Sequence, residues 1–214
     1  MKTLVLAVFL AVISICISCA DNSLTGPSSV ISGSVEKREV VSEPINKILQ
    51  SAEEQTRVTK NYTQAYFTIP YPNGDLPIDT GACSDVVIRS FRAAGIDLQK
   101  EVHEDMAANF AAYPKKWVLS APDTNIDHRR VPNLRTFFTR KGKSIAITAN
   151  PDDYLPGDIV SWDLDGKGMT HIGVVLNLWN ERTKRYLIIH NIGGGTKAED
   201  KLFDWKITGH FRYF

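Results

Sequence analysis

The hydrophobic pattern of this chain changes once, near Gly142, and that change limits the folds it can adopt. Before Gly142 apolar residues recur three and four positions apart, as on one face of a helix. After it come short runs of β-branched and aromatic residues separated by polar turns, which is typical of antiparallel strands. Helices in the N-terminal half and antiparallel strands in the C-terminal half predict an α+β domain. The expected strands cover residues 159–162, 172–178, 186–191 and 207–213.

Four helices are expected before the strands. The first begins near Pro44, a second begins around Cys83 and stops at Gly95, and two more cover residues 98–112 and 132–141. Asp79 or Thr80 is a suitable N-cap for the second helix, which places Cys83 in its first turn.

The N-terminus has the features of an export signal. A positive charge at Lys2 precedes the apolar run 4–13, and small residues follow up to Ala20. The apolar run is shorter than the ~20 residues that a membrane-spanning helix needs. We therefore predict a signal peptide at 1–18, a flexible tether at 19–43 that is rich in serine, glycine and proline, and a folded domain at 44–214.

The end of the signal, Cys16-Ile17-Ser18-Cys19, resembles a bacterial lipoprotein processing site, in which the cysteine after a small residue is acylated. The usual pattern has leucine where this chain has Cys16, so ordinary cleavage after Ser18 or Ala20 is the alternative. The prediction is an exported protein of the periplasm or cell envelope, held at the membrane only through a lipid on Cys19.

Composition excludes some partners. Hydrophobic residues make up 43% and charged residues 23% of the chain, as in ordinary globular proteins. Lys2 is the only charged residue in the predicted signal. Without it the chain has 24 lysine and arginine residues, as many as its 24 aspartate and glutamate residues. A neutral domain of this kind is not expected to bind nucleic acid, and we expect a monomer.

Cys83 is the only cysteine in the predicted folded domain. A single thiol in an exported protein is either buried and inert or retained for its chemistry. At a helix N-terminus the macrodipole and free backbone N–H groups would lower the pKa of the thiol, and the same N–H groups could form an oxyanion hole. The second interpretation thus predicts a reactive thiolate.

Two histidines lie on the predicted strands. His171 opens the strand Thr-His-Ile-Gly-Val-Val, where a neutral imidazole could accept the proton of Cys83 and form an ion pair with it. His190 ends the next strand and could orient His171, but Asn191 is a rival. Because successive strand residues face opposite sides, only one of the two can point at His171.

These motifs resemble the NlpC-type branch of the papain-like cysteine peptidases. The match rests on Ala-Cys-Ser-Asp-Val-Val at the helix start, then Pro-Gly-Asp-Ile-Val, His-Ile-Gly-Val-Val and Ile-Ile-His. Residues 66–213 are more closely similar to a bacterial envelope family known as a domain of unknown function, DUF1287. Four further segments carry that match: 79–85, 102–106, 127–133 and 207–210.

The resemblance implies a papain-like fold and a catalytic triad of Cys83, His171 and His190 that cuts amide bonds in peptidoglycan stem peptides, without a cofactor. One departure lies at the helix start: NlpC-type enzymes commonly have aspartate before the cysteine and glycine two residues after it. This chain has Ala82 and Asp85 there. The substrate preference of those enzymes is therefore not carried over.

Several other residues are candidates for the binding of substrate. Asp85, one turn into the helix, could contact substrate or cap the helix. Tyr71 lies in a proline-rich loop that could cover a cleft. Arg129 and Arg130 could clamp substrate carboxylates, since guanidinium groups bind carboxylates in pairs of hydrogen bonds. Trp162 is the tryptophan expected to line the cleft.

No metal site is expected. His103, Glu104 and Asp105 are adjacent, and adjacent residues on a helix point in different directions. No zinc-like spacing is present.

The expected function is that of a cell-envelope cysteine hydrolase, an amidase or endopeptidase acting on peptidoglycan peptides. The alternatives are an acyltransferase or lipid-acting hydrolase on the same fold, and a non-catalytic module that binds the cell wall. The order of cysteine before histidine favours the peptidase over the lipid-acting branch.

Overall fold

A computed structural model describes residues 39–118 and 120–214. Four α-helices precede the main sheet: α1 (Glu43–Val58), α2 (Cys83–Ala93), α3 (Leu98–Asn109) and α4 (Val131–Arg140). Short 3₁₀ helices cover Phe110–Ala112, Asp127–Arg129 and Pro151–Asp153. The strands are β1 (Asn61–Tyr62), β2 (Thr80–Gly81), β3 (Ile159–Asp163), β4 (Thr170–Asn180), β5 (Arg185–Asn191), β6 (Thr196–Glu199) and β7 (Lys206–Phe211). The predicted α+β fold is confirmed.

The main sheet is antiparallel and has the order β6-β5-β4-β3-β7. β4 and β5, which carry the two histidines, are neighbours near its centre. β6, an edge strand of sequence Thr-Lys-Ala-Glu, was not among the expected strands, because it lacks a hydrophobic alternation. β1 and β2 form a separate parallel pair just before α2.

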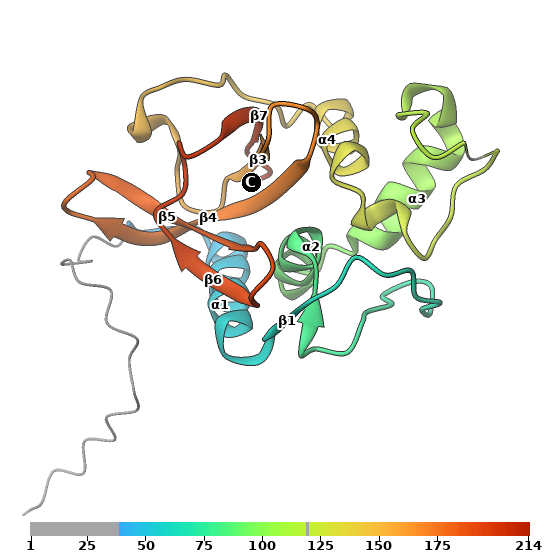
Figure 1. The fold of residues 1–214 in the computed structure, drawn as a ribbon, viewed down its shortest axis with the longest axis horizontal. Helices are drawn as coiled ribbons and strands as arrows, with labels where there is room; N and C mark the ends of the chain where they lie inside the picture. Colours follow the sequence, from blue (N-terminus) through green and yellow to red (C-terminus); the bar gives the residue numbers. More distant parts are fainter. Residues whose placement is uncertain (1–38, 119) are drawn as a thin grey trace, which may run out of the picture. The chain divides into compact units, whose positions relative to one another are not determined.

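Helices pack against one face of the sheet (Figure 1). α2 lies against β4 and β5, and α1 lies against α2 and β6. Phe91 of α2, Phe138 of α4 and Ile172 of β4 belong to the large buried cluster between these layers, which also contains Cys83. The N-terminus of α2 is thereby held against the first residues of β4.

The other face of the sheet is covered by a second, smaller core. Trp162 is fully buried there, and its indole N–H donates to the carbonyl of Leu202 at 2.9 Å. The expectation that Trp162 lines a cleft is therefore wrong: alternation along β3 turns this side chain toward the loop at Leu202.

The first described residue already contacts the sheet. Glu39 donates its N–H to Asn177 of β4 at 2.8 Å, and its carbonyl accepts from the same amide at 2.9 Å. The predicted signal peptide, Cys19 and most of the predicted tether lie outside the described residues. Within the described part of the chain, none of the helices combines the length and apolar character of a membrane span.

Candidate active site

Cys83 occupies the first turn of α2, as expected, but the cap differs from the expected one. The N-cap is Ala82, because Thr80 and Gly81 are engaged in β2. The carboxylate of Asp85 accepts the backbone N–H of Ala82 at 2.6 Å and so closes the turn from the other side. Of the two roles expected for Asp85, capping is the one that the structure shows.

The thiol of Cys83 is surrounded by backbone donors. The backbone N–H groups of Ile172, Ser84 and Cys83 itself favour its ionised form and act to lower its pKa. The contact with Ile172 places the sulfur beside the peptide that joins His171 to Ile172. The helix N-terminus and the start of β4 therefore meet at the sulfur atom.

Burial decides the protonation state of this thiol. Cys83 is only 5% exposed, and desolvation raises its pKa to about 11, helped by the nearby charge of Asp85 and opposed by the backbone N–H groups. Burial, with a smaller contribution from His190, lowers the pKa of His171 to about 3. The sequence-based expectation of a preformed thiolate and imidazolium is thus wrong: near pH 7 both groups are neutral, because the desolvation cost outweighs the backbone donors.

His171 and His190 are in direct contact. Nε2 of His171 lies 2.7 Å from Nδ1 of His190, and both rings are buried. Asn191 points to the opposite side and donates to the carbonyls of Asn61 at 3.2 Å and Gly81 at 3.0 Å. Gly173 allows β4 and β5 to approach here, since a Cβ at this position would lie 2.8 Å from the carbonyl of Ile189. The structure therefore places His190, and not Asn191, against His171.

Glu199 on the edge strand β6 extends this pair. Its Oε2 lies 3.1 Å from Nε2 of His190, off the axis of the N–H bond. Burial lowers the pKa of His190, and the carboxylate of Glu199 opposes that effect. A proton on Nε2 of His190, attracted by Glu199, makes Nδ1 an acceptor for the Nε2–H of His171. His171 then keeps its lone pair on Nδ1, the form that a general base needs.

Half-buried Trp205 packs beside both histidines. Its ring centroid lies 5.9 Å from that of His171 and 6.1 Å from that of His190. The ring of Trp162 lies 5.8 Å from His171 and 6.2 Å from Trp205. These rings exclude water from the contact between the two imidazoles.

Arg129 is part of the scaffold of the site. Its guanidinium binds Asp85 through two hydrogen bonds of 2.9 and 3.1 Å, and the two side chains are 3% and 4% exposed. A third bond of 2.9 Å reaches the carbonyl of Ala65. The expectation of a substrate clamp is wrong for Arg129, because Asp85 and backbone carbonyls already take up its donors.

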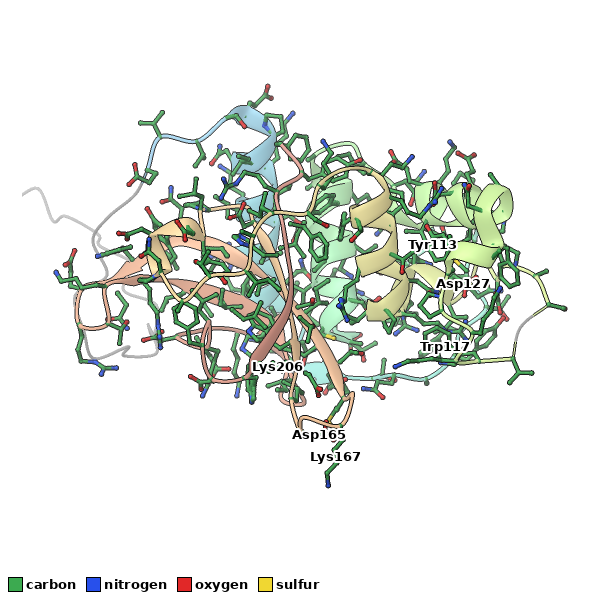
Figure 2. All side chains as sticks on the ribbon, turned by 90° about the horizontal axis from the view of Figure 1, so that it is seen from above. Tyr113, Trp117, Asp127, Asp165, Lys167 and Lys206 are labelled. Carbon is green, nitrogen blue, oxygen red and sulfur yellow. The ribbon has the colours of Figure 1, made fainter. Side chains whose placement is uncertain are left out.

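Arg130 is also engaged. It donates to Asp127 at 2.7 Å, and its guanidinium lies over the ring of Trp117 at 4.2 Å. Figure 2 shows Trp117 and Asp127 close together at the end of the domain that carries α3. The carboxylate of Asp127 thus offsets the charge that was expected to bind substrate.

A cleft of about 500 Å³ opens at Cys83. Aromatic side chains of Tyr62, Tyr66 and Trp117 contribute to its walls. These three residues were not among the expected site residues, since exposure cannot be read from residue type. The rest of the lining comes from the segment after β1, the start of α2, the loop after α3, the 3₁₀ segment before α4, α4 itself and the β3–β4 turn: Gln64, Ala82, Ser84, Lys116, Ile126, Arg129, Arg130, Val131, Pro132, Gly168 and Thr170.

Tyr71 is not in this lining. Its ring packs edge-on against His103 of α3, with the ring centroids 5.2 Å apart. The loop is held there by Gln99, which donates to the carbonyl of Pro70 at 2.9 Å and accepts from Gly74 at 2.8 Å. The expected role for Tyr71 is therefore wrong: its loop is tied to α3 rather than laid over the cleft.

The acidic residues after His103 turn away from it. Glu104 pairs with Lys100 at 2.9 Å, and Asp105 binds Arg140 at 2.6 Å and the hydroxyl of Tyr113 at 2.7 Å. Among residues 39–118 and 120–214, no group of three or more histidine, cysteine, aspartate or glutamate side chains is arranged to hold a metal ion.

The site thus consists of a cysteine at a helix N-terminus with a cleft at the thiol, and the antiparallel sheet of the same α+β domain carries a histidine pair. The chain belongs to the family described as domain of unknown function (DUF1287), which matches residues 49–213.

Two known proteins are similar to it. The "Uncharacterized protein YijF" of Escherichia coli (strain K12) is 54% identical over 167 residues, which are 78% of this chain and 80% of YijF. The solved structure of NlpC1 from Trichomonas vaginalis has a TM-score of 0.44 and 14% sequence identity. That alignment covers 82% of this chain but less than half, 46%, of NlpC1.

Proposed function

We propose that this protein is a cysteine hydrolase, an amidase or endopeptidase that cuts amide bonds in the peptides of peptidoglycan. The observation that carries the proposal is the position of the Cys83 thiol, at the start of α2 and in the wall of the cleft, beside Ile172 of β4, the strand that also carries His171 and so its partner His190. These are the groups that acyl transfer from an amide to a thiol requires.

The reaction would begin from neutral groups. As the sulfur of Cys83 attacks the amide carbonyl, His171 takes the thiol proton and later gives it to the leaving amine. Backbone N–H groups at the start of α2 would stabilise the oxyanion. Water, activated by the same imidazole, would then release the acyl group and restore the thiol.

A second candidate is a cell-wall binding module without activity, and one observation favours it. A buried thiol with a pKa of about 11 is also what an inert structural cysteine would show. The acyltransferase or lipid-acting alternative receives no such support, because cationic and aromatic side chains, rather than a long apolar channel, line the cleft.

Digestion of purified peptidoglycan separates these candidates. The hydrolase should release soluble peptides whose masses, read by mass spectrometry, identify the amide bond that was cut. A protein that pulls down with peptidoglycan but releases no fragments would be a binding module.

Glu199 should act as a positioning residue. Glu199→Ala removes the acceptor oxygen that holds the proton on Nε2 of His190, so we expect kcat to fall roughly 5- to 30-fold, as for loss of about 1–2 kcal/mol of alignment. Glu199→Gln keeps an acceptor oxygen and should restore most of the rate. The measurement is the pH–rate profile of peptide release by the two variants.

Glu54→Ala, which removes an exposed carboxylate of α1 that pairs with Arg57, is the matched control and should change kcat little. Equal losses in Glu199→Ala and Glu199→Gln, with unchanged pH profiles, would contradict the assignment, since a merely structural role has no reason to depend on the acceptor.

We also propose that the protein is exported and anchored in the cell envelope by a lipid on Cys19. Wild-type protein should then partition with membranes, and Cys19→Ala should be released into the soluble fraction. Detection of wild-type protein in the soluble fraction, with an unacylated N-terminus by mass spectrometry, would reject the anchor.

A further inference from the structure

A second hollow adjoins the Cys83 cleft. It has a volume of about 640 Å³ and follows α4 toward β7. Lys116, Pro132 and Thr170 line both hollows. A substrate that reaches Cys83 can therefore extend along α4.

The lining of this continuous groove is one-sided in charge. It contains no aspartate or glutamate, whereas five cationic side chains contribute to it: Lys116, Arg129, Arg130, Arg135 and Arg140. Acidic residues behind the walls offset three of these charges, through the pairs Asp85–Arg129, Asp127–Arg130 and Asp105–Arg140. Within the described residues, Lys116 and Arg135 remain without a carboxylate partner.

Arg135 is held in place but not neutralised. Its Nη2 donates to the carbonyl of Thr208 at 2.6 Å, at the bulge of β7 where the register with β3 shifts. Its buried Nε has no hydrogen-bond partner. Burial lowers the pKa of Arg135, and no carboxylate opposes that effect. A partly buried guanidinium with free donors is an unfavourable arrangement that a bound carboxylate would relieve.

We propose that Arg135 binds a carboxylate of the substrate, with Lys116 providing a second positive charge where the groove joins the Cys83 cleft. The substrate class is thus an anionic peptide that carries a free carboxylate outside the amide bond to be cut. Guanidinium suits this task because its donors match the two carboxylate oxygens. The inference rests on the proposed hydrolase function and adds a specificity determinant to it.

The test compares two probes: a peptidoglycan stem peptide with free carboxylates and the same peptide with its carboxylates amidated. Arg135→Gln should raise KM for the free peptide about 10- to 100-fold, in line with loss of a charge-assisted pair, and change kcat less than about twofold. Wild-type protein should show the high KM for the amidated peptide, and Arg135→Gln should not raise it further. Arg182→Gln, an exposed arginine in the β4–β5 turn, is the matched control.

Folding of Arg135→Gln is checked by circular dichroism and thermal unfolding. If that variant does not fold, Arg135→Lys keeps the charge but not the paired donors, and it should raise KM for the free peptide alone by a smaller factor. A rise in KM that is equal for both peptides, or absent for both, would overturn the carboxylate site.

Binding measured in the Cys83→Ala background separates this inference from the hydrolase proposal. If wild-type protein cleaves neither peptide, yet Cys83→Ala binds the free peptide more tightly than the amidated one and Arg135→Gln removes that difference, the carboxylate site stands and the hydrolase fails. If both peptides are cleaved with the same KM, the hydrolase stands and the carboxylate site fails.

Discussion

Cys83→Ala is expected to abolish release of peptides from peptidoglycan while leaving the protein folded. Removal of the nucleophile from a cysteine–histidine site typically lowers kcat by a factor on the order of 10³ or more. The substitution deletes one sulfur atom at the edge of the large core, so the loss of stability should be small, about 1 kcal/mol. The measurements are fragment release, followed by mass spectrometry, and thermal unfolding. A folded Cys83→Ala protein that still releases peptides at the wild-type rate would remove Cys83 from the mechanism.

The protonation state of Cys83 gives this prediction a second readout. Because burial raises the thiol pKa to about 11, the thiolate fraction at pH 7 is only about 10⁻⁴. Because the pKa is raised, the thiolate is the minor form below pH 11, and its fraction grows about tenfold with each pH unit as the pH approaches 11. Alkylation by iodoacetamide, read from the peptide that contains Cys83, should therefore be slow at pH 7 and rise steadily to about pH 11.

Rapid alkylation at pH 6–7 would show that the resting site holds a thiolate, as the position of Cys83 at a helix N-terminus suggests by itself. His171→Ala is the control for this experiment. If the thiolate depended on an ion pair with His171, this variant would slow the reaction, whereas a neutral site predicts little change.

Asp85→Ala is expected to destabilise the protein by about 3–5 kcal/mol, the cost of leaving a buried charge without its partner. The carboxylate lost is bound by Nε and Nη2 of Arg129 and by the N–H of Ala82, so one substitution leaves a buried guanidinium and an uncapped helix start. Because Arg129 also holds the segment at Ala65, the cleft wall should loosen as well. The measurement is the free energy of unfolding from urea denaturation.

The double variant Asp85→Ala with Arg129→Met should recover part of that loss, since it removes both charges from the interior. Glu104→Ala is the matched control: its partner Lys100 is half exposed, and such a pair contributes less than about 1 kcal/mol. If Asp85→Ala lowers the free energy of unfolding no more than Glu104→Ala does, the Asp85–Arg129 pair does not stabilise the cleft wall.

Local patterns in the sequence were sufficient for the fold class and for most elements. The change from helical to alternating periodicity at Gly142 predicted helices followed by an antiparallel sheet, and the expected helix start near Cys83 agrees with α2. These features depend on residues only a few positions apart, where side-chain periodicity reports directly on the local backbone. The edge strand β6 was missed because its four residues carry no such period.

Tertiary structure decided what the polar side chains do. From the sequence, Arg129 was expected to be a free cation that binds substrate. In the folded protein it pairs with Asp85, 44 residues earlier, in the interior. Glu199 could not be assigned, since its distance to His190 depends on the pairing of β5 with β6. The sequence by itself determined where Cys83, His171 and His190 lie on helix and strands; only packing decided that the thiol and the imidazole are neutral. Desolvation depends on every layer that covers a group, and no local pattern encodes it.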